Sequence, residues 1–377
     1  MSIEIKEVTT LALRKAFIRF GDELYAGNPY YVPALFVDEM NYYDRNKNKN
    51  YAFCEDISYL AYQDGKVVGR ITGLINHAYN DKKGLKQLRF HHFDMIDDVE
   101  VSKALLNAIA KWGQAKGMNE FNGPIGMTDF DKQGMLLDGY DLDSMMITIY
   151  NYPYYVEHMK TLGFVKDVDW REYRVYLPKE VDPRIARIAE TVAKKRGFRL
   201  LKFKNKKEMM PYLVQAFEVY NQAFAPLHGV VELQMDQINM YIDQYIGMLN
   251  FRYIQLVVND KDEVIGFAAL VPSLSNAMRK AKGKLFPFGW YHVLKALKHP
   301  KILDMFFVAV KPEYQGMGVN ALMMLDATRC ANEDGVLFAE TGPELEDNTL
   351  VQGQWDNYEH EIVRHRRCYS RPLEELD

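Results

Sequence analysis

The fold is decided by the stretch Phe306-Phe307-Val308-Ala309-Val310-Lys311-Pro312-Glu313-Tyr314-Gln315-Gly316-Met317-Gly318-Val319-Asn320-Ala321-Leu322. Its β-branched and aromatic start is typical of a strand that ends at Pro312, and a helix is predicted to begin near Val319. Gly316 and Gly318 let the connection turn tightly and approach a ligand without a Cβ clash. Free N–H groups and partial positive charge at the helix start favour an anion such as a pyrophosphate. An ordinary strand–turn–helix connection is the alternative.

The succession of a strand, Val-x-Pro-x-Tyr-Gln-Gly-x-Gly and a helix resembles the acetyl-CoA signature of the GNAT (GCN5-related N-acetyltransferase) superfamily. In the family pattern, (Gln/Arg)-x-x-Gly-x-(Gly/Ala), Gln315 and Gly318 match, whereas Asn320 stands in the last position. A side chain there would narrow the path of the phosphates, although Asn is well suited to helix starts. The resemblance implies that acetyl-CoA or another acyl-CoA binds as co-substrate along Val308, Ala309, Val310, Gln315, Gly316, Met317, Gly318, Val319 and Asn320.

The resemblance continues downstream of the signature helix. The family places a strand there, then an Asn that opens another helix, then a closing strand; these match Leu337–Glu340, Asn348 and Ile362–Tyr369. In the family this Asn often contacts pantetheine or pyrophosphate, which adds Asn348 to the expected CoA contacts. Where many members carry a Tyr that protonates the departing thiolate, this chain has Trp355, with Tyr358 one turn later. The chain also resembles a poorly characterised bacterial branch of tandem GNAT-like proteins.

The expected reaction is direct attack of an acceptor amine on the CoA thioester, with a base removing a proton from the amine. Backbone N–H groups of the strand would stabilise the oxyanion. Glu340, at the end of its strand, is the first candidate base and Glu346 the second, and Tyr358 is the candidate acid. The acceptor is expected to be a small-molecule amine or a peptide, and the sequence does not identify it.

The two halves of the chain follow a similar order of elements. Asp64–Gly73 and Asp262–Leu270 each read as a turn entering a strand with a mid-strand glycine, and each follows another strand candidate, which predicts two β-hairpins. Each half then continues with a strand, a helix and a strand: Leu88–Phe93, Val101–Ala115 and Glu120–Gly123 in the first; Met305–Val310, Val319–Asn332 and Val336–Glu340 in the second. This order predicts an α+β fold of two tandem GNAT-like units, each a mixed, mostly antiparallel sheet flanked by helices.

A polar stretch with two prolines, Leu177–Pro183, marks the expected boundary and gives units of about 1–177 and 182–377. In the first unit, Phe90–Glu100 occupies the place of the loop, contains no glycine and carries four acids that would repel a pyrophosphate. We therefore expect a degenerate first unit without CoA binding. His91, His92 and Asp94 raise the question of a metal, but alternation along a strand would put the two histidines on opposite faces. No metal is expected.

Two further segments leave alternatives open. Tyr150–Tyr155 is either a rigid aromatic loop packed between the units or one wall of an acceptor pocket. Leu274–Leu303 contains seven Lys or Arg, no acid and several aromatic residues. The preferred interpretation is a helical hairpin with a solvated basic face and its aromatics in the core. Contact with an anionic membrane surface, an acidic acyl carrier or the 3′-phosphate of CoA are the alternatives.

Composition narrows the class of protein further. The formal net charge of −4 over 377 residues argues against nucleic-acid binding by the whole chain. The three cysteines match no metal or disulfide pattern. No signal-peptide core or membrane-span-length apolar run is present, so a cytoplasmic protein is expected.

Two other hypotheses fit the same fold. One keeps the transferase but takes the acyl group from aminoacyl-tRNA or an acyl carrier protein. The other is a non-catalytic module that binds a ligand or a protein, which the departures at Asn320 and Trp355 favour. Titration with acetyl-CoA and CoA separates these classes.

Overall fold

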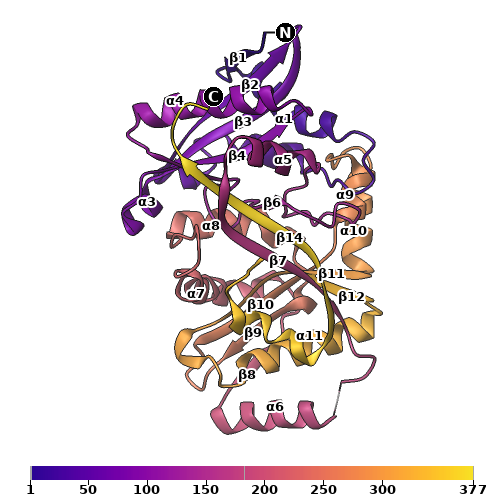
Figure 1. Cartoon of the computed structure of the whole chain (residues 1–377). Coiled ribbons are helices and arrows are strands. Elements are labelled where there is room, and N and C mark those ends of the chain that lie inside the picture. Colours follow the sequence, from indigo (N-terminus) through magenta and orange to yellow (C-terminus); the bar gives the residue numbers. More distant parts are fainter. Residues whose placement is uncertain (1, 182, 377) are drawn as a thin grey trace.

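The computed structural model describes residues 2–181 and 183–376, so Asp182 and Asp377, the predicted limits of the second unit, lie outside the described residues. Within these ranges the strands join into one 14-stranded mixed sheet, ordered β1-β2-β3-β4-β5-β14-β7-β12-β11-β10-β9-β8, with β6 on β14 and β13 on β7. Helices flank this sheet along its length (Figure 1). The predicted α+β class is confirmed, and the sheets of the two halves are continuous.

The first half supplies the upper part of Figure 1. Its strands are β1 (Glu4–Glu7), β2 (Cys54–Gln63), β3 (Lys66–Asn76), β4 (Gln87–Met95), β5 (Glu120–Gly123), β6 (Met135–Leu136) and β7 (Val165–Tyr176). Its helices are α1 (Leu11–Leu24), α2 (Phe36–Tyr42), η1 (Lys49–Ala52), α3 (His77–Lys83), α4 (Val99–Ala115) and α5 (Tyr154–Thr161).

The second half supplies the lower part. Its strands are β8 (Arg199–Leu201), β9 (Ile254–Val258), β10 (Val264–Pro272), β11 (Ile302–Val310), β12 (Phe338–Thr341), β13 (Glu344–Leu345) and β14 (Glu359–Pro372). Its helices are α6 (Pro183–Arg196), α7 (Lys206–Phe224), α8 (Met235–Tyr245), η2 (Ile246–Met248), η3 (Phe251–Tyr253), α9 (Ser275–Ala281), α10 (Gly289–Lys298), η4 (Pro312–Tyr314), α11 (Val319–Asp334), α12 (Thr349–Gln352) and η5 (Trp355–Asn357).

Both predicted hairpins are present, as β2–β3 and β9–β10. The mid-strand glycines have the same physical reason in each half. A Cβ on Gly69 would lie 2.8 Å from Leu105 of α4, and one on Gly266 would lie 2.7 Å from Val319 of α11. Glycine therefore lets the long helix of each half pack directly on its sheet.

The long strands β7 and β14 tie the halves together. β7 pairs with β12 of the second half on one edge and with β14 on the other. β14 was expected to close the second unit, but its far end pairs with β5, with Tyr369 opposite Gly123, and so it completes the sheet of the first half. Strands of 12 and 14 residues are long enough to run through both halves, as Figure 1 shows.

The basic segment between β10 and β11 forms the predicted helical hairpin, α9 and α10, on one side of the molecule (Figure 1). The expectation that its aromatics lie in the core is wrong. Phe286 and Phe288, which precede α10, and Trp290 and Tyr291 on it are all exposed. The side of α10 that packs on the rest of the protein is the one with Val293 and Leu297. None of the helices in the described part of the chain has the length and apolarity that crossing a bilayer requires.

Candidate functional site

The sheet opens where β11 and β12 part. The two strands are parallel and paired from Ile302 to Met305, and the Gly342 N–H closes the ladder on the Met305 carbonyl at 3.0 Å. Beyond this point β11 continues to Val310, bonded only to β10 and bent by a bulge at Ala269/Leu270. The Lys311 N–H donates to β10 at 2.9 Å, so alternation turns the N–H groups of Val308 and Val310 toward the open edge.

The glycine loop follows at the end of this open edge. Gly316 and Gly318 have φ of 72° and 89°, and Gly318 is the N-cap of α11. Left-handed backbone favours glycine, and a Cβ at Gly318 would also lie 3.2 Å from Val192 of α6. The side chain of Gln315 donates to the Val310 carbonyl at 3.2 Å and holds the loop against the strand. The first N–H groups of α11 therefore face the mouth of the loop without a helical acceptor.

A cleft of about 1400 Å³ lies between the open strand and the segment after β12. Nine of the ten predicted CoA-binding residues line it, and Met317 in the loop does not. The lining residues among the predicted set are Val308, Ala309, Val310, Gln315, Gly316, Gly318, Val319, Asn320 and Asn348.

 Eight of these nine belong to the open strand, the loop and the start of α11, and Asn348 comes from the far wall, at the start of α12.

Asn320 and Asn348 both take part in local hydrogen bonds. Asn348 is the N-cap of α12, as predicted, and accepts from the Val351 N–H at 3.4 Å. The Asn320 amide donates to Gln354 at 2.8 Å, which ties the start of α11 to the far wall, while its Oδ1 is buried without a partner. The residue that departs from the family pattern thus lines the cleft and also carries a buried oxygen without a partner.

The three predicted catalytic residues lie outside the cleft lining. Thr341 faces the cleft, so its neighbour Glu340 points to the opposite side of β12. Glu346 is ion-paired with Lys166. Tyr358 packs against the second-half core, and burial raises its pKa. The structure therefore offers these residues no direct approach to a thioester on β11.

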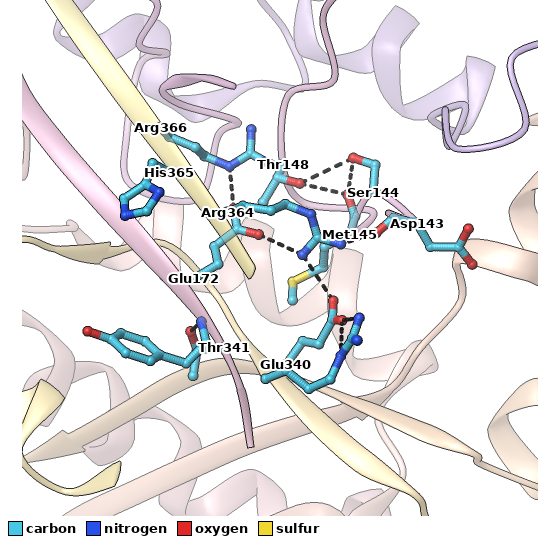
Figure 2. Close-up of polar contacts among 12 residues, drawn as sticks. Asp143, Ser144, Met145, Thr148, Glu172, Glu340, Thr341, Arg364, His365 and Arg366 are labelled. Atoms are coloured by element: carbon cyan, nitrogen blue, oxygen red, sulfur yellow. Dashed lines mark hydrogen bonds and ion pairs between the residues drawn. The ribbon is translucent and has the colours of Figure 1, made fainter. Parts of the chain in front are cut away.

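Glu340 instead belongs to a buried ion-pair network between the halves (Figure 2). Its carboxylate accepts from Arg174 at 2.6 Å and from Arg364 at 3.1 Å. Arg364 also binds Glu172 at 3.1 Å, and Glu172 accepts a further bond from Arg366. Arg364, Arg366 and Glu172 are fully buried, so these charges compensate one another in place of water.

A different carboxylate, Glu344, lines the cleft opposite the open strand. It lies on β13, which pairs with β7, and the indole N–H of Trp355 donates to its two oxygens at 3.1 and 3.2 Å. Burial raises the pKa of Glu344 to about 8, and the Trp355 hydrogen bond only partly offsets this. A carboxyl that titrates near neutral pH in a cleft suits general-base catalysis. Glu344 was not among the catalytic residues predicted from the sequence.

Behind the open strand the cleft widens into an aromatic chamber, defined here by Phe130, Tyr220, Tyr241, Tyr245 and Phe307. The Phe130 ring stacks on Tyr241 at 4.2 Å and contacts Phe307 at 4.8 Å. Helices α7 and α8 supply the tyrosines, and the first half supplies Phe130. Both halves therefore build one apolar compartment that is continuous with the candidate donor site.

The corresponding place in the first half is nearly filled. Its cavity measures about 70 Å³. The last ladder bond is donated by the Ile96 N–H in the first half and by the Lys311 N–H in the second. Met95 of β4, which precedes Ile96, is therefore the counterpart of Val310. The Met95 N–H donates to the Tyr155 hydroxyl at 3.3 Å, and the Tyr154 hydroxyl donates to the Met95 carbonyl at 2.7 Å. Tyr155 thus occupies a backbone N–H whose counterpart, that of Val310, faces the open edge in the second half, whereas the Val310 carbonyl is bonded by Gln315.

The two histidines of β4 do not alternate as expected. His92 has a φ of 44°, and its ring lies 4.2 Å from that of His91, because the bulge opposite Arg70/Thr72 interrupts the strand. His92 bonds Glu39 and Tyr43, both at 2.8 Å. Among the described residues, the group with metal-ligand spacing is another one: Asp167, His228 and Cys368, whose ligand atoms lie within 4.8 Å of one another. The sequence spacing gave no sign of it.

No protein-family model matches the chain. Protein YghO of Escherichia coli (strain K12) is 27% identical over 368 residues, which cover 95% of this chain and 93% of that protein. A protein named bacterial ceramide synthase, from Caulobacter vibrioides (strain NA1000 / CB15N), is 23% identical over 303 residues, covering 78% and 77%.

Solved structures match along the full length. A tandem GNAT protein from the clavulanic acid biosynthesis pathway superposes with a TM-score of 0.55 at 11% identity, covering 100% of both chains. A GCN5-related N-acetyltransferase from Sphaerobacter thermophilus gives 0.53 at 10% identity, covering 99% of this chain and 96% of that one. At such identities the likeness concerns the fold. The resemblance to tandem GNAT proteins is confirmed at this level, and the chain has an acyltransferase fold.

Proposed function

We propose that the chain is an acyl-CoA-dependent N-acyltransferase whose substrates include a long hydrocarbon chain. The observation that carries the proposal is the cleft itself, which joins an open strand edge and a glycine loop to an aromatic chamber. The loop suits the CoA pyrophosphate, and the strand edge suits the thioester. The chamber suits an alkyl chain, because its aromatic rings gain from removing apolar surface from water.

One relative supports the acceptor class. The Caulobacter protein is named a ceramide synthase, and a ceramide is a long-chain amino alcohol acylated on nitrogen. Two carboxylates at the chamber, Asp129 and Asp131, offer negative charge to an ammonium group. Asp131 is held by the N–H groups of Met127 and Thr128, at 2.7 and 3.0 Å. A lipid amine is therefore the acceptor that we propose.

In the proposed reaction, the bound ammonium first releases one proton to solvent, and Glu344 takes a second proton from the resulting amine as the nitrogen attacks the thioester carbon. The N–C bond forms, and the carbonyl oxygen takes negative charge opposite the Val308 and Val310 N–H groups. The C–S bond then breaks, and the proton passes from Glu344 to the departing sulfur. This return is nearly balanced, because the pKa of Glu344, about 8, is close to that of a thiol.

Calorimetric titration with CoA and release of CoA thiol from palmitoyl-CoA in the presence of sphinganine test the proposal. We expect CoA binding, and release that requires the amine and falls when either chain is shortened. Binding to neither CoA nor palmitoyl-CoA would refute it.

A non-catalytic binding module remains the second candidate, because Glu340 and Tyr358, the residues matched to catalytic roles, lie outside the cleft. The same titration separates the two functions. CoA binding with no release from any acyl-CoA and amine pair would favour the module.

A further inference from the structure

The helical hairpin between β10 and β11 presents an unusual surface. Its outer surface, here called the aromatic tip, consists of Phe286, Phe288, Trp290, Tyr291 and Leu294. Phe286 and Phe288 are 79% and 73% exposed, and Tyr291 is 54% exposed. Large apolar side chains at such exposure, grouped within nine consecutive positions, are uncommon on a soluble surface and mark an interaction site.

The tip does not result from a loosely attached segment. The inner side of α10, at Val293 and Leu297, packs with Met278 of α9 against the first half. Arg279 bonds Asp143 at 2.7 Å, and the Ser275 hydroxyl donates to the Ser144 carbonyl at 2.8 Å. The hairpin is therefore fixed on the body of the protein, and its outer aromatics are held away from the core.

Positive charge surrounds the tip. Lys280, Lys282, Lys284, Lys295, Lys298 and Lys301 are all exposed. The segment Leu274–Leu303 holds seven of the 47 Lys and Arg residues of the chain and none of its 51 Asp and Glu residues. The whole chain is negative, at −4, so this surface carries a concentrated charge of opposite sign.

We propose that the aromatic tip and its lysines dock the protein on an anionic membrane surface. Lysines attract acidic headgroups, and aromatic side chains prefer the boundary between headgroups and acyl chains. With α10 lying along the membrane surface, Trp290, Tyr291 and Leu294 enter the interface and Lys295 and Lys298 reach the phosphates. The proposal stands independently of the transferase activity, although a membrane is also where a lipid amine resides.

Vesicle sedimentation with the full chain is the primary test. The probe is phosphatidylcholine vesicles with about 30% phosphatidylglycerol, compared with phosphatidylcholine alone, at about 0.05 M and 0.5 M salt. We expect binding to the anionic vesicles that weakens at high salt. Neutralising Lys295 and Lys298 with Gln should weaken binding by about fivefold for each lysine. The double variant Phe286→Ser/Phe288→Ser should weaken it by about tenfold or more.

Matched controls separate docking from general surface effects. Ile188→Ser on α6 removes an apolar side chain that is 64% exposed, and Lys194→Gln/Lys195→Gln removes two charges from the same helix. These variants should bind vesicles as the parent does. Because the docking residues are exposed, all variants should keep the parent unfolding temperature.

Tryptophan fluorescence gives a second measurement. Of the four tryptophans, Trp290 is the most exposed, and Trp170 and Trp355 are buried. Anionic vesicles should shift the emission of the parent to shorter wavelength, and Trp290→Phe should abolish the shift while the protein still sediments with vesicles.

Three outcomes would overturn the proposal. The first is no binding to anionic vesicles at low salt. The second is a concentration-dependent dimer that the Phe286→Ser/Phe288→Ser variant abolishes, without vesicle binding, which would assign the tip to a second copy of the chain. The third is binding to an acidic acyl carrier protein but not to vesicles, which would assign the lysines to a protein partner.

Discussion

Replacing Glu344 by Gln tests the proposed chemistry at its centre. Burial raises the pKa of Glu344 to about 8, so at pH 7 only about one tenth of the molecules carry the ionised base. The kcat/KM for amine-dependent CoA release should therefore rise about tenfold per pH unit below pH 8 and level off above it. Glu344→Gln should lower the plateau by roughly 10²–10⁴-fold and leave CoA binding unchanged.

Replacing the neighbouring Trp355 should shift the pH profile in a predictable direction. Its indole hydrogen bond lowers the pKa of Glu344, so Trp355→Phe should move the inflection of the pH profile to higher pH. Glu346→Gln is the matched control, because Glu346 is ion-paired with Lys166 outside the cleft and should keep the parent profile. The reasoning is refuted if Glu344→Gln turns over normally, or if it retains the same inflection as the parent.

Three other variants address the glycine loop, the buried Asp304 and the ion-pair network of Glu340. Gly318→Val places a side chain at a φ of 89° and 3.2 Å from Val192, so the CoA dissociation constant measured by calorimetry should rise by about tenfold or more. Burial raises the pKa of Asp304, a residue of β11, from 3.8 to about 8, so this carboxyl stays neutral in the folded protein at pH values where it ionises in the unfolded chain. The free energy of unfolding is therefore highest below about pH 4 and falls by up to about 1.4 kcal/mol per pH unit as the pH rises to 8. Asp304→Asn should flatten this decline in urea unfolding, and an unchanged slope would contradict the reasoning. Arg364→Ala leaves Glu172 and its buried charge without one partner and should cost about 3–5 kcal/mol of unfolding free energy, whereas a loss below about 1 kcal/mol would show that water or Arg366 replaces it.

The sequence predicts those features that depend on neighbouring residues. The glycine loop, the helix after it, the Asn348 cap and both hairpins each follow from a short run of residues with its own conformational preference. The mid-strand glycines also belong here, although the reason for them, the close approach of α4 and α11, is visible only in the packing. Membership of one continuous sheet is a long-range property, and the sequence does not determine which strand pairs with β5.

Which carboxylate faces the cleft depends in the same way on residues that are distant in the sequence. On a strand, neighbouring side chains point to opposite faces, so a one-residue difference decides whether a carboxylate meets the cleft or the core. Glu340 points to the network and its neighbour Thr341 to the cleft. Alternation does not extend to Glu344 and Glu346, because β12 ends at Thr341 and β13 at Leu345; of these two carboxylates only Glu344 lines the cleft. Nothing within residues 340–348 reveals this choice, because Arg364, which binds Glu340, and Trp355, which binds Glu344, come from later in the chain.

The two halves differ in a way that bears on how the cleft is built. In the first half, Tyr155 accepts from the β4 backbone N–H whose counterpart on β11 faces the open edge, and the cavity there measures only about 70 Å³. The first half supplies Phe130 to the chamber of the second half, and β7 and β14 hold the two in register. If this account is correct, Phe130→Ala should enlarge the chamber and shift the preferred substrate to a longer chain, while CoA binding at the distant loop stays unchanged. A loss of CoA binding together with chain preference would instead show that Phe130 supports the fold of the whole cleft.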